Sequence, residues 1–255
     1  GIINFAYWLA KHDLTYQNID SKGLQLVDEY AEAWSYYLIK ASADLAVEFG
    51  APSGNMETKY GHGITPNQTY KKDLDELIPH VERMDWTTLR EQLKDTGIRN
   101  STLMALMPAE TSAQIANATN GIEPPRSLIS VKQSKHGVLK QVVPEYKRLK
   151  NKYDLLWDQK SPEGYLKIMA VLQKYIDQGI SINTSYNPIF FEDEKIPMST
   201  MLQHMLMFYK YGGKQLYYFN TNDGQGELDV GKMMGELPEL EQSDIDDEDC
   251  ESCKI

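Results

Sequence analysis

The chain has 255 residues, 41% of them hydrophobic, and a formal net charge of −11. Its length allows one domain or two small ones. No apolar run of about 18 residues occurs, which argues against a membrane span, and the start lacks the basic residues and small-residue cleavage site of a secretory signal. A cytoplasmic protein is therefore expected. No clustered basic segment accompanies the negative charge, so broad nucleic-acid binding is not expected.

The first hundred residues are predicted to be mainly helical. Gly1 stands directly before an apolar helical pattern, so we expect the chain to begin inside a longer polypeptide. Apolar residues recur at helical spacing over 24–49 and a glycine follows, which predicts one long amphipathic helix. Residues 51–69 are rich in Gly, Pro, Asn and Thr and are typical of a loop. Shorter helices are predicted near 70–80 and 86–95.

Strands and helices alternate in the rest of the chain. The short apolar run 100–108, closed by a proline, predicts a buried strand, and a helix should begin near residue 111. Two apolar stretches around the SKHG turn predict a hairpin in which Gly137 supplies the turn. Further helices are predicted over 144–157, 162–178 and 197–210, and short strands around 180–184 and 214–220. This alternation predicts an α/β architecture with parallel pairing.

The segment MPAETSAQIANATNGIEPPR, residues 107–126, is a candidate phosphate site. The predicted strand ends at Pro108, and Thr111 or Ser112 can cap the helix that follows. The backbone N–H groups of the first helical turn, the helix dipole and the two hydroxyl groups would attract an anion. An ordinary helix cap explains the same residues, and Glu110 opposes a phosphate unless its carboxylate turns away. The residues alone leave both interpretations open.

Two adjacent tyrosines close the last predicted strand. Tyr217 and Tyr218 could relay an oxidising equivalent, since a phenol can lose one electron and one proton to become a neutral radical. Tyrosine also favours strands in general, and the chain contains 16 of them, so an ordinary strand explains the pair equally. Neighbouring side chains on a regular strand point to opposite faces, so stacked rings would require a strand end or a bulge.

Residues 221–255 contain 12 Asp and Glu but only two lysines, which is typical of a flexible, disordered tail. Both cysteines of the chain lie in it. The spacing of Cys250 and Cys253 fits half a metal site, a redox disulfide or an incidental pair. Without a second cysteine pair or grouped histidines, a closed zinc site within this chain is not expected. The acidic neighbours should slow the thiols, which suits a tethered dithiol carrier better than a stand-alone oxidoreductase.

In this order along the chain, LMPAETSAQIANATNGIEPPR, the LYY strand and the terminal CESCKI resemble the large subunits of class Ia ribonucleotide reductases. GIINFAYWLAK and TYKKDLDEL resemble them too, so the resemblance covers essentially the whole chain. It implies thioredoxin- or glutaredoxin-dependent reduction of ribonucleoside diphosphates to deoxyribonucleoside diphosphates for DNA synthesis. It also implies that residues 1–220 form the second half of a ten-stranded α/β barrel, with a small helix-strand insertion near 57–107 and a flexible acidic tail over 221–255.

The resemblance assigns the substrate's diphosphate to a loop of five residues: Pro108, Ala109, Glu110, Thr111 and Ser112. The family's radical cysteine, its two reducing cysteines and its regulatory nucleotide-binding regions have no counterpart here, so the chain is not expected to catalyse the reaction alone. Its expected first partner is the amino-terminal portion of the large subunit. That portion is either a separate polypeptide or the rest of an intact one, and the sequence leaves both open.

The resemblance also assigns the redox residues. Tyr218 would take the hole from a radical-generating small subunit, and Tyr217 would pass it to the radical cysteine. Cys250 and Cys253 match the tail dithiol that re-reduces the active-site disulfide, although they stand closer together here than in bacterial relatives. No cofactor or metal is expected to bind this chain directly, because the di-iron tyrosyl radical belongs to the separate small subunit.

Two interpretations from other classes stay open. A degenerate nucleotide-phosphate-binding module would keep the helix-cap site and carry out no chemistry. A scaffold would use the apolar stripe of the predicted helix 197–210 to dock a partner, although such a stripe more often belongs to the core. Docking is also compatible with a reductase, since the stripe could hold the tail of the small subunit. The stripe consists of Met198, Met201, Leu202, Met205, Leu206 and Tyr209.

Overall fold

The computed structural model describes residues 1–134 and 137–222. Its α-helices are α1 (Phe5–Lys11), α2 (Ser21–Phe49), α3 (Trp86–Thr96), α4 (Glu110–Ile115), α5 (Tyr146–Leu149), α6 (Glu163–Gln173) and α7 (Met198–Lys210). Its strands are β1 (Ile129–Ser134), β2 (Gly137–Val142), β3 (Thr184–Tyr186) and β4 (Phe219–Thr221). Within the described part, no helix is both long and apolar enough to cross a bilayer.

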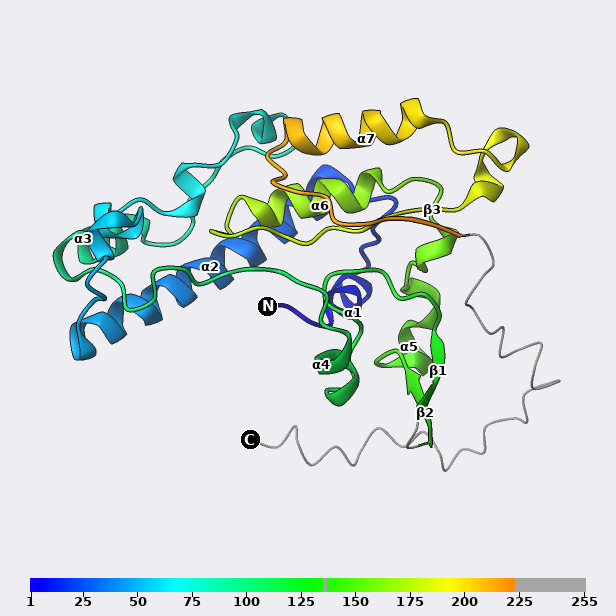
Figure 1. Cartoon of the computed structure of the whole chain (residues 1–255), viewed down its shortest axis with the longest axis horizontal. Helices are drawn as coiled ribbons and strands as arrows, with labels where there is room; N and C mark the ends of the chain where they lie inside the picture. Colours follow the sequence, from blue (N-terminus) through cyan, green and yellow to red (C-terminus); the bar gives the residue numbers. More distant parts are fainter. Residues whose placement is uncertain (135–136, 223–255) are drawn as a thin grey trace.

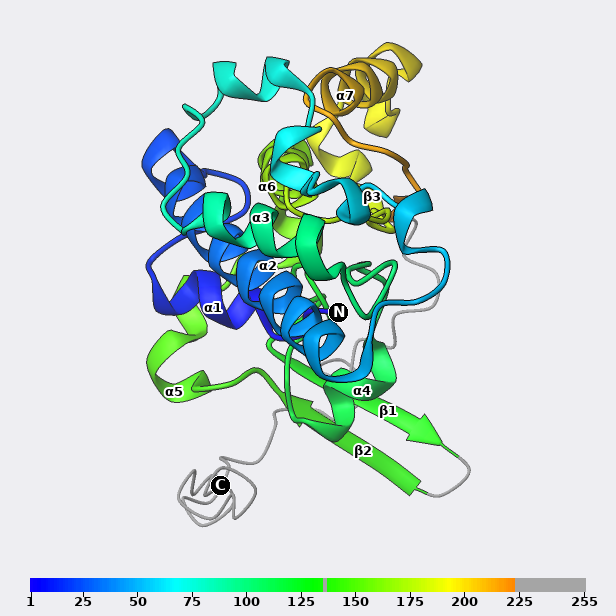
Figure 2. The same ribbon diagram turned by 90° about the vertical axis from the view of Figure 1, so that its left-hand side faces the viewer.

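Three helices stack in layers to form the main core. The side chain of Asp20 accepts a hydrogen bond from the Gly23 N–H at 2.7 Å and so begins α2, while Gly50, with φ of 77°, ends it. Helix α6 packs between α2 and α7, as Figures 1 and 2 show from two directions. Every residue of α6 except Glu163 and Lys167 is buried, as expected for a central layer.

Three segments distant in sequence run side by side as parallel strands. The central one, 178–186, bonds to residues 104–106 on one side and to 217–222 on the other, through backbone hydrogen bonds of 2.7 to 3.4 Å. The carboxyl ends of all three therefore meet at one edge, where ligands of parallel α/β folds usually bind. The predicted mixture of helices and parallel strands is confirmed, and within the described residues the strands do not close into a barrel.

The long helical predictions are confirmed. Those over 24–49, 86–95, 162–178 and 197–210 correspond to α2, α3, α6 and α7. The predicted hairpin is also present: β1 and β2 pair antiparallel, with Ser134 opposite Gly137 at the turn end.

Three other predictions are wrong in extent. The helix predicted near 70–80 is a short 3₁₀ turn, Lys72–Glu76, because Pro79 disfavours helical backbone just before it. The helix predicted over 144–157 is reduced to α5 and short turns, since Glu145 takes a left-handed φ of 50° before it. The strand predicted over 100–108 narrows to a single bridge at Leu106.

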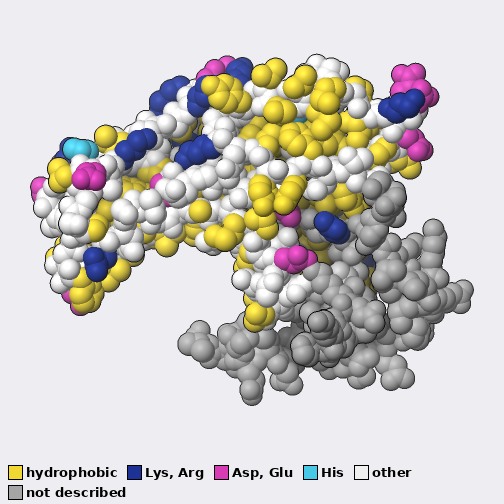
Figure 3. Space-filling model, in the orientation of Figure 1, with side chains coloured by type: hydrophobic (Ala, Val, Ile, Leu, Met, Phe, Trp, Pro, Cys, Tyr) yellow, Lys and Arg dark blue, Asp and Glu magenta, His cyan; other side chains and the backbone are white. Residues whose placement is uncertain are grey.

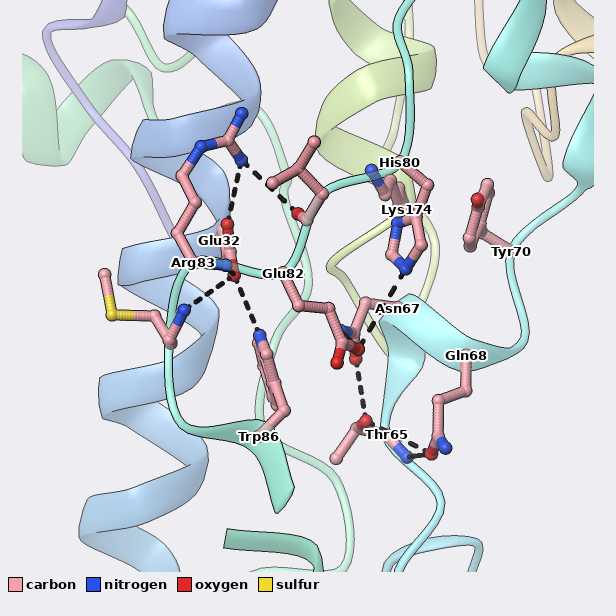
Figure 4. Close-up of polar contacts among 12 residues, drawn as sticks. Glu32, Thr65, Asn67, Gln68, Tyr70, His80, Glu82, Arg83, Trp86 and Lys174 are labelled. Atoms are coloured by element: carbon pink, nitrogen blue, oxygen red, sulfur yellow. Dashed lines mark hydrogen bonds and ion pairs between the residues drawn. The ribbon is translucent and has the colours of Figure 1, made fainter. Parts of the chain in front are cut away.

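A buried polar cluster fastens the stretch before α3 to α2 and α6 (Figure 4). The buried carboxylate of Glu32 accepts hydrogen bonds from the backbone N–H of Arg83 at 2.6 Å and from the indole N–H of Trp86 at 2.9 Å. The Arg83 guanidinium lies 2.9 Å from both Glu32 and Asp28. Lys174, directly after α6, reaches Asp28 at 2.9 Å, so each buried charge has an opposite charge beside it.

Candidate functional site

The loop 108–112 follows the first of the three parallel segments and leads into α4. The N-cap position is Ala109, and the helix begins at Glu110. The prediction that Thr111 or Ser112 caps the helix is therefore wrong, since both lie inside its first turn, with exposed side chains. Their hydroxyl groups consequently face outward and do not serve as the side-chain cap of this helix.

A side-chain hydrogen bond holds this loop in place. The Ala109 N–H donates to Oδ1 of Asn120 at 3.2 Å. Asn120 belongs to the NGIEPPR turn, whose start is fixed to the amino end of α1, because the Thr119 N–H donates to Oδ1 of Asn4 at 3.0 Å. The first helical bond of α4 runs from the Ala113 N–H to the Ala109 carbonyl at 2.8 Å. The amides of Thr111 and Ser112, which precede the first helical donor, therefore lie outside the helical ladder and can face a ligand.

The two tyrosines lie directly before β4, in contact with each other. Their ring centroids are 4.1 Å apart, their planes are inclined by 54°, and the Tyr218 hydroxyl donates to the Tyr217 hydroxyl at 3.3 Å. This is the strand-end placement that a contacting pair requires. Both side chains are about half exposed. The hydrogen bond to Tyr217 raises the pKa of Tyr218 above its ordinary value.

One cavity of about 600 Å³ connects the loop to the tyrosine segment. Pro108 and Glu110 line it from the loop, and Tyr218 lines it from the parallel strands. Thr111, Ser112 and Tyr217 are not among its lining residues. The volume lies within the range of about 300–1,000 Å³ usual for small-molecule sites. The structure therefore brings together part of each predicted site, with Tyr218 rather than its neighbour facing the shared space.

Sequence analysis missed a carboxylate in the wall of this cavity. Glu123 accepts hydrogen bonds from the amide nitrogens of Asn120, at 3.2 Å, and Asn183, at 2.7 Å. Burial raises the pKa of Glu123, while the bond from Asn183 and the charge of Arg126 oppose that rise. Glu123 lies inside the NGIEPPR motif, and Asn183 is a polar residue in a strand with buried isoleucines. Both signals were present in the sequence, but nothing in it paired the two residues.

The comparison with protein families decides the class. A model of the family described as "Ribonucleotide reductase, barrel domain" matches residues 1–219. The chain belongs to this family. The matched region includes the loop 108–112, both tyrosines and the first two parallel segments, and it ends inside the third, so the resemblance drawn from the sequence is confirmed for the family.

Individual members of the reductase family are similar over nearly the whole chain. The ribonucleoside-diphosphate reductase subunit alpha of Haemophilus influenzae is 53% identical over 235 residues, covering 91% of this chain and 31% of the relative. The ribonucleoside-diphosphate reductase 1 subunits alpha of Salmonella typhimurium and Escherichia coli are 50% and 49% identical over 257 residues, covering 100% of this chain and 32% of each relative. The chain thus spans about a third of the length of the curated relatives it matches.

Within the reductase family assignment, individual residue roles stay predictions. The loop 108–112 and the pair Tyr217 and Tyr218 have the geometry described above. Cys250 and Cys253 lie outside the described residues, as does nearly all of the acidic segment.

Proposed function

We propose that this chain is the part of a ribonucleoside-diphosphate reductase that holds the substrate's diphosphate and the last tyrosines of the radical route. It would act in the reduction of ribonucleoside diphosphates to deoxyribonucleoside diphosphates in the cytoplasm. The observation that carries the proposal is the cavity shared by the loop 108–112 and Tyr218, in a chain of the reductase barrel family. The relatives, which are named as ribonucleoside-diphosphate reductase alpha subunits, support the same activity.

The diphosphate is proposed to bind at the loop 108–112. The exposed hydroxyls and the backbone amides of Thr111 and Ser112 can donate hydrogen bonds to phosphate oxygens. Helix α4 has only six residues, so the donors themselves, rather than a strong helix dipole, would supply most of the attraction.

The tyrosine pair is proposed to carry the oxidising equivalent. The di-iron tyrosyl radical of the separate small subunit would supply it, and Tyr218 would give up one electron and one proton. The Tyr218 oxygen, 3.3 Å from that of Tyr217, would then accept an electron and a proton from Tyr217. Tyr217 would regain one electron and one proton from a cysteine of the upstream portion, which becomes the radical that starts the reaction.

The rest of the catalytic centre is proposed to come from other polypeptide. The amino-terminal portion of the large subunit would supply the reactive cysteines and the strands that complete the ten-stranded barrel. Cys250 and Cys253 would re-reduce the active-site disulfide and would be reduced in turn by thioredoxin or glutaredoxin. No cofactor bound directly to this chain is needed for these roles.

The small subunit is proposed to dock on α7. Hydrophobic side chains gather over this helix along the upper edge of Figure 3. Met198 and Leu206 are each 67% exposed and Tyr209 is 68% exposed, an unusual density for one helix face. An apolar helix face of this kind suits the tail of a partner protein.

Reconstitution tests the proposed function. The chain is mixed with the amino-terminal portion, the small subunit, a ribonucleoside diphosphate and a dithiol reductant, and deoxynucleotide is measured. We expect product only when this chain is present, and its loss with Tyr217→Phe or Tyr218→Phe, since phenylalanine keeps the packing but cannot carry the hole. Tyr37→Phe is the control, because Tyr37 is an exposed tyrosine on α2, outside the cavity lining. A phosphate-binding module without chemistry would bind the nucleotide and form no product in any mixture.

A further inference from the structure

A continuous chain of side-chain hydrogen bonds joins the loop to the tyrosine strand. At one end, the Ala109 N–H donates to Oδ1 of Asn120, whose Nδ2 donates to Oε2 of Glu123. At the other end, the Tyr218 N–H donates to Oδ1 of Asn183, whose Nδ2 donates to Oε1 of Glu123. All four distances lie between 2.7 and 3.2 Å. The carboxylate of Glu123 is therefore the midpoint between the two proposed functional segments.

The chemistry of the Glu123 carboxylate fixes the direction of every hydrogen bond in this chain. An ionised carboxylate only accepts hydrogen bonds, so both asparagines must turn their nitrogens toward Glu123. Each asparagine then presents its oxygen to a backbone N–H, of Ala109 on one side and Tyr218 on the other. If either amide turned around, its nitrogen would face a backbone N–H, donor against donor, and its oxygen would face the Glu123 carboxylate, acceptor against acceptor. A residue at position 123 that only accepts hydrogen bonds thus fixes the orientation of both arms of the chain of hydrogen bonds, the arm through Asn120 and the arm through Asn183.

We infer that Glu123 is a positioning residue that holds the substrate loop and the tyrosine strand in mutual register through Asn120 and Asn183. This rests on the proposed function, because the two segments matter to each other only if substrate and radical meet between them. The backbone supports the same role, since the Glu123 N–H donates to the Asn120 carbonyl at 3.1 Å and makes that arm short and rigid.

The two arms should have separable effects in the assembled enzyme. Asn120→Ala releases the loop and should raise KM for the nucleoside diphosphate about tenfold with little change in kcat. Asn183→Ala releases the Tyr218 backbone and should lower kcat about tenfold with little change in KM. A tenfold change is of the size expected for losing one hydrogen bond. Glu123→Gln leaves one acceptor and one donor where two acceptors are needed, so it must disrupt one arm.

Rescue variants distinguish this ordering role from simple packing. In the double variant Glu123→Gln with Asn183→Asp, the glutamine oxygen accepts from Asn120, and its nitrogen donates to the new aspartate. That aspartate still accepts from the Tyr218 N–H, so every bond is restored. Asn183→Asp alone places two carboxylates against each other. We expect each single variant to lose about tenfold in kcat/KM and the double variant to regain most of it.

The decisive experiment measures two quantities on the same variants. Steady-state kcat and KM are measured in the reconstituted enzyme, and backbone hydrogen exchange at Ala109 and Tyr218 is measured in this chain. Exchange at one or both amides should be about tenfold faster in Glu123→Gln and return toward the original rate in the double variant. Asp154→Asn is the control, because Asp154 is another partly buried carboxylate with a raised pKa but binds the Gln17 N–H, outside this hydrogen-bonded chain.

Each outcome has a clear meaning. Unchanged exchange and unchanged kinetics in Glu123→Gln would overturn the inference, as would a double variant no better than its parents. If the unaltered assembly makes no deoxynucleotide but exchange responds as expected, the proposed function fails and the connection through Glu123 stands.

Discussion

At the scale of single residues, Gly164 shows how closely α6 approaches the amino-terminal loop. A Cβ added to Gly164 would overlap the carbonyl oxygen of Tyr16, a backbone atom that cannot move aside easily. We expect Gly164→Ala to lower the free energy of unfolding by about 1–3 kcal/mol, measured by urea denaturation. Gly54→Ala is the control, because the nearest atom to its added Cβ is 3.8 Å away and its φ is −87°. Equal losses in both variants would contradict this explanation.

Glu32 should make stability depend on pH. Burial raises the pKa of Glu32, but hydrogen bonds from Trp86, Arg83 and Met84 outweigh burial and hold that pKa below its ordinary value. A lowered pKa in the folded state stabilises the protein above the unfolded pKa, about 4.3, and this contribution disappears as the pH falls through the folded pKa. We therefore expect the stability difference between the original chain and Glu32→Gln to be about 2–3 kcal/mol at pH 7 and to shrink below pH of about 4.

Urea denaturation across this pH range measures the difference. Glu29→Gln is the matched control, since Glu29 lies 3.5 Å from the same Arg83 but its side chain is 49% exposed. Its loss should stay below about 1 kcal/mol at any pH. A difference for Glu32→Gln that does not vary with pH would show that its hydrogen bonds do not lower the pKa.

Part of the candidate site could be predicted from single residues. Side-chain alternation predicted that Tyr217 and Tyr218 could be in contact only at a strand end or a bulge, and the structure has them in contact directly before β4. The predicted cap of α4 was wrong, because hydroxyl residues favour caps only on average and the N-cap position here is Ala109, two residues before Thr111. The bond between Glu123 and Asn183 joins residues 60 positions apart, and no local pattern specifies such a contact.

At the scale of elements, periodicity predicted the helices that bury one face. It also predicted the length of α7 but not its exposure, because an apolar stripe looks the same whether the protein core or another polypeptide covers it. The ends of the short parallel strands were harder to predict. Segment 104–106 makes only one bridge, so its extent depends on neighbours distant in sequence rather than on its own residues.

The exposed face of α7 leads to a binding prediction. Leu202→Glu and Leu206→Glu place charges where the side chains are 49% and 67% exposed, so folding should be little affected. If the small subunit docks there, each change should weaken its binding at least tenfold, since a buried unpaired charge is costly. Gln203→Glu is the control, because it adds the same charge to an exposed position of α7 outside the stripe. Binding can be measured by calorimetry, and equal affinities for all three variants would rule out this face.

At the scale of the whole molecule, the three parallel segments pair in a defined order, but in the described part of the chain the two outer segments leave their outer edges unpaired. Within residues 1–134 and 137–222, neither 104–106 nor 217–222 pairs with a further strand. Both segments lie beside the cavity, because Pro108, which follows 104–106, and Tyr218, which belongs to 217–222, line it. The proposed functional segments therefore lie next to strand edges that, among the described residues, pair on one side only, where pairing with additional strands would hold them.

This arrangement predicts that the amino-terminal portion of the large subunit stabilises the chain at specific places. Binding to the folded chain should raise its thermal midpoint in a concentration-dependent way. Hydrogen exchange should slow at 104–106 and 219–221 if new strands pair there, while amides in the middle of α6, already bonded and buried, should change little. A complex that leaves exchange at both strand segments unchanged would mean that the partner binds elsewhere. The open sides of the sheet would then not be the surfaces that complete the barrel.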